Sequence, residues 1–431
     1  MSDLYIISIS SALLLAIIFH TVRSRRNTAD RTVIKEKFKA RLKGTISVTS
    51  CFASPFTLLV VPDQINAKYD QDYRNNSSYL ALHVNHADAR FSAKVGGKKV
   101  KIDDFIKKPG NDTSMGIDIG VQQTYWLSYD RDRMTVSYGK GYPMNQTTMI
   151  TFALPQSDKE GDLCSLFAID DQKCCEGLIL LYMKSNDQTG VCAGIISKEP
   201  LIKVCKEPLT VNPSPLILDA DKATLDALDS GDYMLSSQLP QTCARIFNTI
   251  RSVELDSFLI NAIRNSIVTE GCILHNILKK KKYLRITIGE EMGVSPGCPY
   301  VLEIWPAGAT SPIHNHGACC AIVKVLHGTI QCRIYNKMTN PPLAPVKLME
   351  FKASQGEYTW MNEQWYQSHE LNNESEDFCA TLQCYEYATE DTIHWGQFDY
   401  IKDKDLLGFH PGSDLTFSKM KELVRKEFLY K

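Results

Sequence analysis

The pattern of apolar and polar residues changes along the chain and predicts distinct structures in turn. Residues 4–22 form an apolar stretch, LYIISISSALLLAIIFHTV, close to the roughly 20 residues that a helix needs to cross a bilayer. From residue 47 onward, short apolar runs alternate with turns, which is typical of a β-sandwich. Examples of these runs are residues 56–61, 79–84 and 149–154. A proline-spaced segment at 208–215 then indicates a domain boundary.

The C-terminal half places helices before strands. Apolar residues first recur at three and four positions and later form short β runs. The predicted helices cover residues 219–228, 241–251, 255–267 and, at the end, 419–431. The predicted strands cover residues 283–288, 300–305, 321–326, 330–335, 348–351 and 379–385. This order predicts an antiparallel β-barrel preceded by helices, so the fold class is mainly β.

The charges on either side of the apolar stretch predict whether it is a membrane anchor or a cleaved signal peptide, and which way it is oriented. Asp3 precedes it and a basic cluster at residues 23–26 follows it, whereas a signal peptide carries its positive charge first. The positive-inside rule therefore predicts a single-pass signal anchor in residues 1–26, with the body of the protein in the cytosol. Polar, basic residues 27–46 predict a juxtamembrane stalk. The alternative is a cleaved signal, which would make the sequons at Asn76, Asn111 and Asn145 usable.

Composition narrows the possibilities further. The length of 431 residues suggests two or three domains, and we expect a β-sandwich-like domain at 47–211 and a barrel domain at 212–431. A net charge of −1 gives no indication of nucleic-acid binding. Fourteen cysteines without a CxxC pair argue against a zinc knuckle. We expect free thiols in a reducing compartment.

Three histidines in the barrel region are candidate metal ligands. His314 and His316 are two positions apart, so on a β-strand both side chains point to the same face. His369 would complete a facial set, and no carboxylate follows the first pair. Imidazole ligands alone admit zinc, iron, copper or nickel.

Glycine spacing around these histidines resembles the paired motifs of the cupin superfamily. The matching positions are Gly308, His314, His316 and Gly328 in the first motif, and Gly356, His369 and Asn373 in the second. The resemblance implies a jelly-roll barrel that holds a metal ion. Ala321 stands where most cupins place a glutamate ligand. The alternative is a metal-free barrel with buried, hydrogen-bonded histidines.

Residues 240–400 resemble the cysteine dioxygenase family of thiol dioxygenases, which has three histidines without that glutamate. The resemblance implies Fe(2+) as cofactor, and a small thiol amino acid and O2 as substrates. It implies that L-cysteine is oxidised to cysteine sulfinic acid. The residues that match the family's site are Tyr283 and Arg285 for the carboxylate, Trp305 as a buttress, Gln383 beside the substrate and Tyr385 as the catalytic hydroxyl.

The chain departs from this family at two positions. Ala321 replaces the cysteine that animal members crosslink to the catalytic tyrosine, and Cys320 is one residue out of register, so we expect no crosslink. Gln383 replaces a histidine and cannot carry charge. The alternatives are therefore a dioxygenase of 3-mercaptopropionate, or a membrane-tethered binding protein with an inactive barrel.

A second resemblance concerns the N-terminal half. Trp126, Asp130 and the run Gly139-Lys140-Gly141 resemble the repeat of farnesoic acid methyltransferase-type β-sandwich domains, over residues 50–155. It carries no catalytic residue. We expect a binding or spacer module whose protein partner the sequence does not identify.

Overall fold

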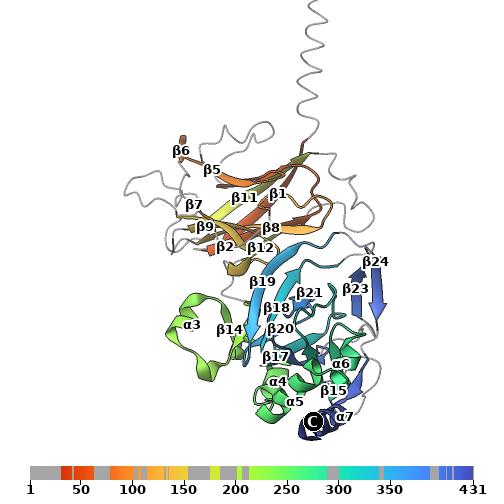
Figure 1. Ribbon diagram of the computed structural model, residues 1–431. Coiled ribbons are helices and arrows are strands. Elements are labelled where there is room, and N and C mark those ends of the chain that lie inside the picture. The colour runs from red at the N-terminus through yellow and green to blue at the C-terminus, as the bar shows by residue number, and fades with distance from the viewer. Residues whose placement is uncertain are drawn as a thin grey trace, which may run out of the picture. The chain divides into compact units, whose positions relative to one another are not determined.

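The computed structural model divides the chain into two compact units (Figure 1). Unit 1 comprises Met1–Pro143 and Thr148–Pro208, and unit 2 comprises Met144–Thr147 and Leu209–Lys431. The structure describes residues 31–40, 43–62, 78–100, 105–107, 114–130, 133, 135–153, 175–184, 201–205, 213–288, 300–338, 344–388, 398–403, 405–409 and 412–430.

Unit 1 is a sandwich of two six-stranded antiparallel sheets. The first has the order β1 (Arg31–Ala40), β11 (Cys175–Lys184), β3 (Phe56–Pro62), β4 (Tyr79–Val84), β5 (Ala89–Val95), β6 (Lys98–Val100). The second has the order β12 (Leu201–Cys205), β2 (Lys43–Ser50), β8 (Gln123–Asp130), β9 (Thr135–Lys140), β10 (Thr148–Ala153), β7 (Phe105–Lys107). Alternate residues such as Leu58, Leu80, Ile46 and Leu127 bring both sheets into one buried core. The predicted β-sandwich is confirmed.

The stalk predicted at 27–46 is wrong where the structure describes it. Residues 31–40 form strand β1, which pairs along its whole length with β11. Ile34 packs against the sandwich core, so the segment is part of the folded sheet and is not a solvated stalk. Strand β1 lies at the edge of its sheet, where charged side chains are common. Its many basic residues therefore led the sequence analysis to predict a solvated stalk instead of a strand.

The prediction of a single-pass membrane protein with a cytosolic body is also corrected. Among the described residues, no helix has the length and apolar character needed to span a bilayer. The longest of them, α7 (Phe417–Tyr430), has 14 residues and a charged face, and reaches only about 21 Å at ~1.5 Å per residue. The stretch at 4–22 that motivated the prediction lies outside the described residues.

Cysteine pairing differs between the units. In the described part of unit 2, seven buried cysteines carry thiols rather than disulfides. Cys51 of unit 1 is disulfide-bonded. The expectation of free thiols throughout is therefore wrong for Cys51.

Short helices precede most of the strands of unit 2, although two short strands, at 216–218 and 233–235, come before and between them (Figure 1). These helices are α3 (Leu225–Ser230), α4 (Gln241–Ile250), α5 (Ser257–Val268) and α6 (Ile273–Leu278). Thr224 and Asp256 accept hydrogen bonds from the first turns of α3 and α5 and so define where these helices begin. The helix predicted at 219–228 is displaced to α3, because residues 220–222 form only a 3-10 turn.

Mostly antiparallel strands build the rest of unit 2, with parallel pairs only at the two ends of its larger sheet among the described residues. An eight-stranded sheet has the order β14 (Tyr233–Leu235), β13 (Leu216–Leu218), β20 (Tyr358–Met361), β17 (Cys320–His327), β22 (Cys379–Glu386), β16 (Tyr300–Trp305), β15 (Leu284–Ile288), β25 (Leu415–Thr416). A second sheet contains β19 (Lys347–Ser354), β18 (Thr329–Tyr335) and β21 (His369–Asn372), and β23 (Phe398–Lys402) pairs with β24 (Asp405–Phe409). Trp305 and Val325 of the first sheet share a core with Ile330 and Leu371 of the second. The predicted helix-preceded jelly-roll barrel and the mainly β class are confirmed.

A buried ion pair in unit 1 joins Lys140 to Asp118. The ammonium of Lys140, whose side chain is 5% exposed, donates to both carboxylate oxygens of Asp118 at 2.8 and 2.9 Å and to the carbonyl of Gly116 at 2.9 Å. Burial lowers the pKa of Lys140, and Asp118 opposes that shift. Lys140 thus ties the loop at 114–121 to strand β9.

Asp118→Ala should destabilise unit 1 by about 3 kcal/mol, because it leaves the buried charge of Lys140 uncompensated. Hydrogen exchange of β8 and β9 in the full chain measures this loss. Asp130→Ala is the matched control, since Asp130 pairs with Lys43 at 3.5 Å near the surface and its loss should cost at most about 1 kcal/mol. Equal effects of the two variants would contradict the assignment.

Candidate metal centre

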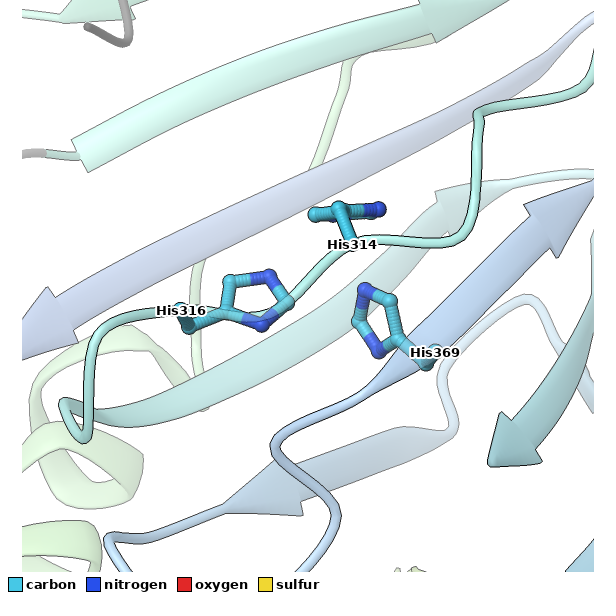
Figure 2. A group of neighbouring side chains, drawn as sticks. All are labelled: His314, His316 and His369. Carbon is cyan, nitrogen blue, oxygen red and sulfur yellow. The ribbon is translucent and has the colours of Figure 1, made fainter. Parts of the chain in front are cut away.

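Backbone pairing brings the three predicted histidines together. The segment that ends at His314 runs antiparallel to β21, and the peptide groups of His314 and His369 exchange two hydrogen bonds of 3.0 Å. Directly opposed residues of such a pair point to the same face of the sheet. His316, two positions on, joins them on that face. Figure 2 shows the three side chains side by side, with His369 contributed by the neighbouring strand.

The three imidazoles form a compact group of ligand atoms. Their ring centroids lie 4.7, 4.7 and 4.5 Å apart, and one nitrogen of each ring lies within 4.8 Å of the others. Among the described residues, no carboxylate or thiol joins this group. The site is therefore an all-nitrogen one, as expected from the alanine at position 321.

Two of the rings are oriented by backbone carbonyls. The Nδ1 of His314 lies 2.9 Å from the carbonyl of Pro312, and the Nδ1 of His316 lies 3.0 Å from the carbonyl of Gln367. Since a carbonyl only accepts, each Nδ1 carries the proton, which leaves Nε2 with a free lone pair. Metal-binding histidines are commonly fixed in this way.

His316 and His369 are buried and His314 is partly exposed, and desolvation favours the neutral form of all three rings at physiological pH. Desolvation lowers the pKa of His314 to about 4, although the hydrogen bond to Pro312 opposes the shift. Desolvation also holds the pKa values of His316 and His369 well below the ordinary range, reinforced by the neighbouring histidines. Neutral imidazoles with free lone pairs are the form that binds a divalent transition metal. The donor set fits such an ion.

Gln367 holds the turn that follows His316. Its backbone carbonyl accepts from His316, its side-chain oxygen accepts from the amide of Ala318 at 2.8 Å, and its side-chain amide donates to the carbonyl of Cys319 at 2.8 Å. Ala318 has a positive φ of 64°, which is uncommon for a residue with a Cβ and is held here by these hydrogen bonds. The sequence motifs did not indicate Gln367, because glutamine has no characteristic spacing to a metal ligand.

A buried ion pair faces the histidines from the other sheet. Arg285 on β15 and Glu303 on β16 are directly opposed, and Arg285 Nη1 donates to Glu303 Oε1 at 2.9 Å. Arg285 lies close enough to His314 and His316 to lower their pKa values. Its Nε is buried and has no hydrogen-bond partner. The sequence predicted Arg285 as part of the site but missed Glu303, because a lone glutamate within a strand is usually solvent-exposed.

Gln383 links this ion pair to Tyr385. Its amide nitrogen donates to the second oxygen of Glu303 and to Thr381, and its amide oxygen accepts from the hydroxyl of Tyr385. Because a carboxylate only accepts, Glu303 fixes which way the Gln383 amide points. The Tyr385 ring stacks near His316, with centroids 5.8 Å apart, and the Arg285 guanidinium lies 5.6 Å from its centroid. Burial raises the pKa of Tyr385, so the hydroxyl stays protonated.

Aromatic packing supports the ion pair from the barrel core. Tyr283 stacks on Trp305 with centroids 4.1 Å apart, and the Trp305 indole donates to Thr381 at 3.2 Å. Burial raises the pKa of Tyr283. The structure therefore brings every predicted site residue to this side of the barrel.

The cysteines beside the site are arranged as strand alternation requires. Ala321 is directly opposite Tyr385 across β17 and β22, whereas Cys320, which is also buried, points to the other face of its strand, 3.7 Å from the carboxylate of Glu363. Cys319, two positions before Ala321, is buried, and burial raises the pKa of its thiol far above the ordinary range. Cys319 lies close enough to Tyr385 to raise the pKa of its hydroxyl, and the expectation that Cys320 forms no crosslink stays a prediction.

Comparison with known proteins adds weak likenesses. No family model and no curated protein matches the chain. Solved structures that match include a cupin-superfamily sugar phosphate isomerase from Silicibacter pomeroyi, with 15% identity, 33% of this chain and 85% of the other covered, and a TM-score of 0.21. A cupin domain from Schizosaccharomyces pombe matches with 13% identity, 26% and 68% coverage and a TM-score of 0.20. A DMSP lyase from Ruegeria pomeroyi matches with 14% identity, 26% and 50% coverage and a TM-score of 0.19. At these TM-scores the likenesses carry no argument, so the fold rests on the strands described above.

His316→Ala should abolish stoichiometric binding of a transition metal, with an affinity loss of at least about 100-fold. Metal content after loading, measured by mass spectrometry, checks this. His327→Ala is the matched control, because His327 is bound to Asp377 at 3.1 Å and is outside the ligand group. Equal metal content in both variants would contradict the assignment.

Proposed function

We propose that this protein is an Fe(II)-dependent thiol dioxygenase that oxidises L-cysteine to cysteine sulfinic acid. The observation that carries the proposal is that three neutral histidines, with no carboxylate among the ligand atoms, face a buried arginine with an unused donor. Three neutral ligands leave the charge of a divalent ion uncompensated. An anionic co-ligand such as a thiolate completes such a site better than a neutral substrate does.

Arg285 is the residue that would recognise the substrate carboxylate. Glu303 occupies Nη1 and Tyr385 also hydrogen-bonds to the guanidinium, so the Nε edge, whose Nε has no partner, remains for a substrate carboxylate. A buried donor without a partner is costly, and a carboxylate on this edge would satisfy it. Tyr283, stacked on Trp305, keeps the wall of the site rigid beside the guanidinium.

Tyr385 would act on the reacting sulfur through its hydroxyl. The hydroxyl donates to Gln383, and its oxygen also hydrogen-bonds to Arg285. A protonated phenol can also donate after a small rotation, so Tyr385 can stabilise charge on an oxygen that develops near His316. The reaction adds both atoms of dioxygen to the thiolate, RS⁻ + O2 → RSO2⁻. Iron, when bound, supplies the redox chemistry that lets dioxygen react with the thiolate.

Iron-loaded protein should consume one O2 for each L-cysteine and yield the sulfinate. An oxygen electrode together with product mass spectrometry measures both, with 3-mercaptopropionate and cysteamine assayed in parallel. Faster turnover of 3-mercaptopropionate than of L-cysteine would favour the other carboxylate thiol as the substrate. Metal-loaded protein that consumes no oxygen with any of the three thiols would refute the proposal.

Arg285→Lys should raise the KM for L-cysteine at least about tenfold, because lysine keeps the charge but lacks the bidentate fork. The KM for cysteamine should change less than about threefold, because cysteamine has no carboxylate for the guanidinium to bind. Steady-state oxygen consumption gives both values. Arg333→Lys is the matched control, since Arg333 forms surface ion pairs with Glu350 and Glu370 on the other sheet. An equal rise for both thiols in Arg285→Lys would remove Arg285 from carboxylate recognition.

A further inference from the structure

The carboxylate of Glu303 is a buried charge of the site that the reaction itself does not require. Glu303 is 4% exposed and lies on the interior face of β16, between Arg285 on β15 and Thr381 on β22. Arg285 donates to one of its oxygens and Gln383 donates to the other. Burial raises the pKa of Glu303, but the Arg285 guanidinium, 2.9 Å away, opposes this shift and favours the carboxylate form.

This carboxylate cancels the charge that would attract an anionic substrate. Arg285 and Glu303 together contribute no net charge to the site, although Arg285 still offers the Nε donor on its other edge. A substrate carboxylate on that edge would lie on the opposite side of one guanidinium from a second carboxylate. Inside a protein, such a like charge is screened much less than in water.

The two candidate substrates differ in how strongly the Glu303 carboxylate would repel them. L-cysteine and 3-mercaptopropionate both carry a thiolate and a carboxylate when bound, but only L-cysteine carries an ammonium group beside the carboxylate. The ammonium offsets the carboxylate charge, so a zwitterionic head group is repelled less by Glu303 than a bare carboxylate is.

Building on the proposed function, we propose that Glu303 selects the charge class of the thiol. By neutralising Arg285, it favours α-amino acid thiols over thiols whose only other charged group is a carboxylate. Glu303 is a specificity-determining residue that acts through Arg285, the guanidinium with which it pairs.

Glu303→Gln tests this, because it keeps the shape of the side chain and removes its charge. Dissociation constants of L-cysteine and 3-mercaptopropionate are measured by calorimetry on iron-loaded protein without oxygen, and kcat/KM for both thiols is measured with oxygen. Wild type should bind L-cysteine at least about tenfold more tightly, and Glu303→Gln should shift the ratio of the two constants about tenfold toward 3-mercaptopropionate. Glu303→Asp keeps the charge and should leave the ratio within about threefold of wild type, even if both affinities fall.

Glu350→Gln serves as the matched control, since Glu350 makes ion pairs with Arg333 and Lys347 on the other sheet. An unchanged ratio in Glu303→Gln, an equal shift in Glu303→Asp, or wild type that binds the two thiols equally would overturn the inference. Thiols that bind without being oxidised would refute the dioxygenase activity, while the binding ratio would still decide the role of Glu303. Wild type that binds neither thiol would refute both.

Discussion

The antiparallel register between His314 and His369 is the constraint on which the candidate centre depends. Two mutual backbone hydrogen bonds hold these residues opposite each other, and His316 follows on the same face. A one-residue shift in the pairing register would turn one of these side chains to the other face of the sheet, and the three histidines would no longer form a ligand group. Gln367 then fixes the turn after His316, so the strands and this turn set the ligand geometry before any metal binds.

The interior of the barrel is of low polarity, which explains why the buried polar side chains beside the histidines are paired with one another. The buried charge of Arg285 is tolerated because Glu303 lies directly across the strand pair. Glu303 in turn orients Gln383, and Gln383 orients the hydroxyl of Tyr385. One carboxylate therefore organises a network that runs from the guanidinium of Arg285 to a tyrosine beside the histidines.

The sequence predicted most elements of the barrel unit, since its apolar periodicity is strong. Strand β16 has the predicted bounds, and the strands predicted around Ala321 and Tyr385 agree with β17 and β22 within a residue or two. The N-terminal region was harder to predict. Strand β1 is rich in lysine, and its place in a sheet is set by β11, which is more than a hundred residues away.

By itself, the sequence determined which residues can bind a metal, because imidazoles at positions i and i+2 share a face of any strand. It also indicated Arg285 and Tyr385 through a family resemblance. Only the tertiary structure decided that Glu303 neutralises Arg285 and that Gln367 clamps the turn after His316. These contacts join residues 18 and 51 positions apart. Pairing and burial, which no local pattern encodes, decide whether a charged or amide side chain faces solvent or the site.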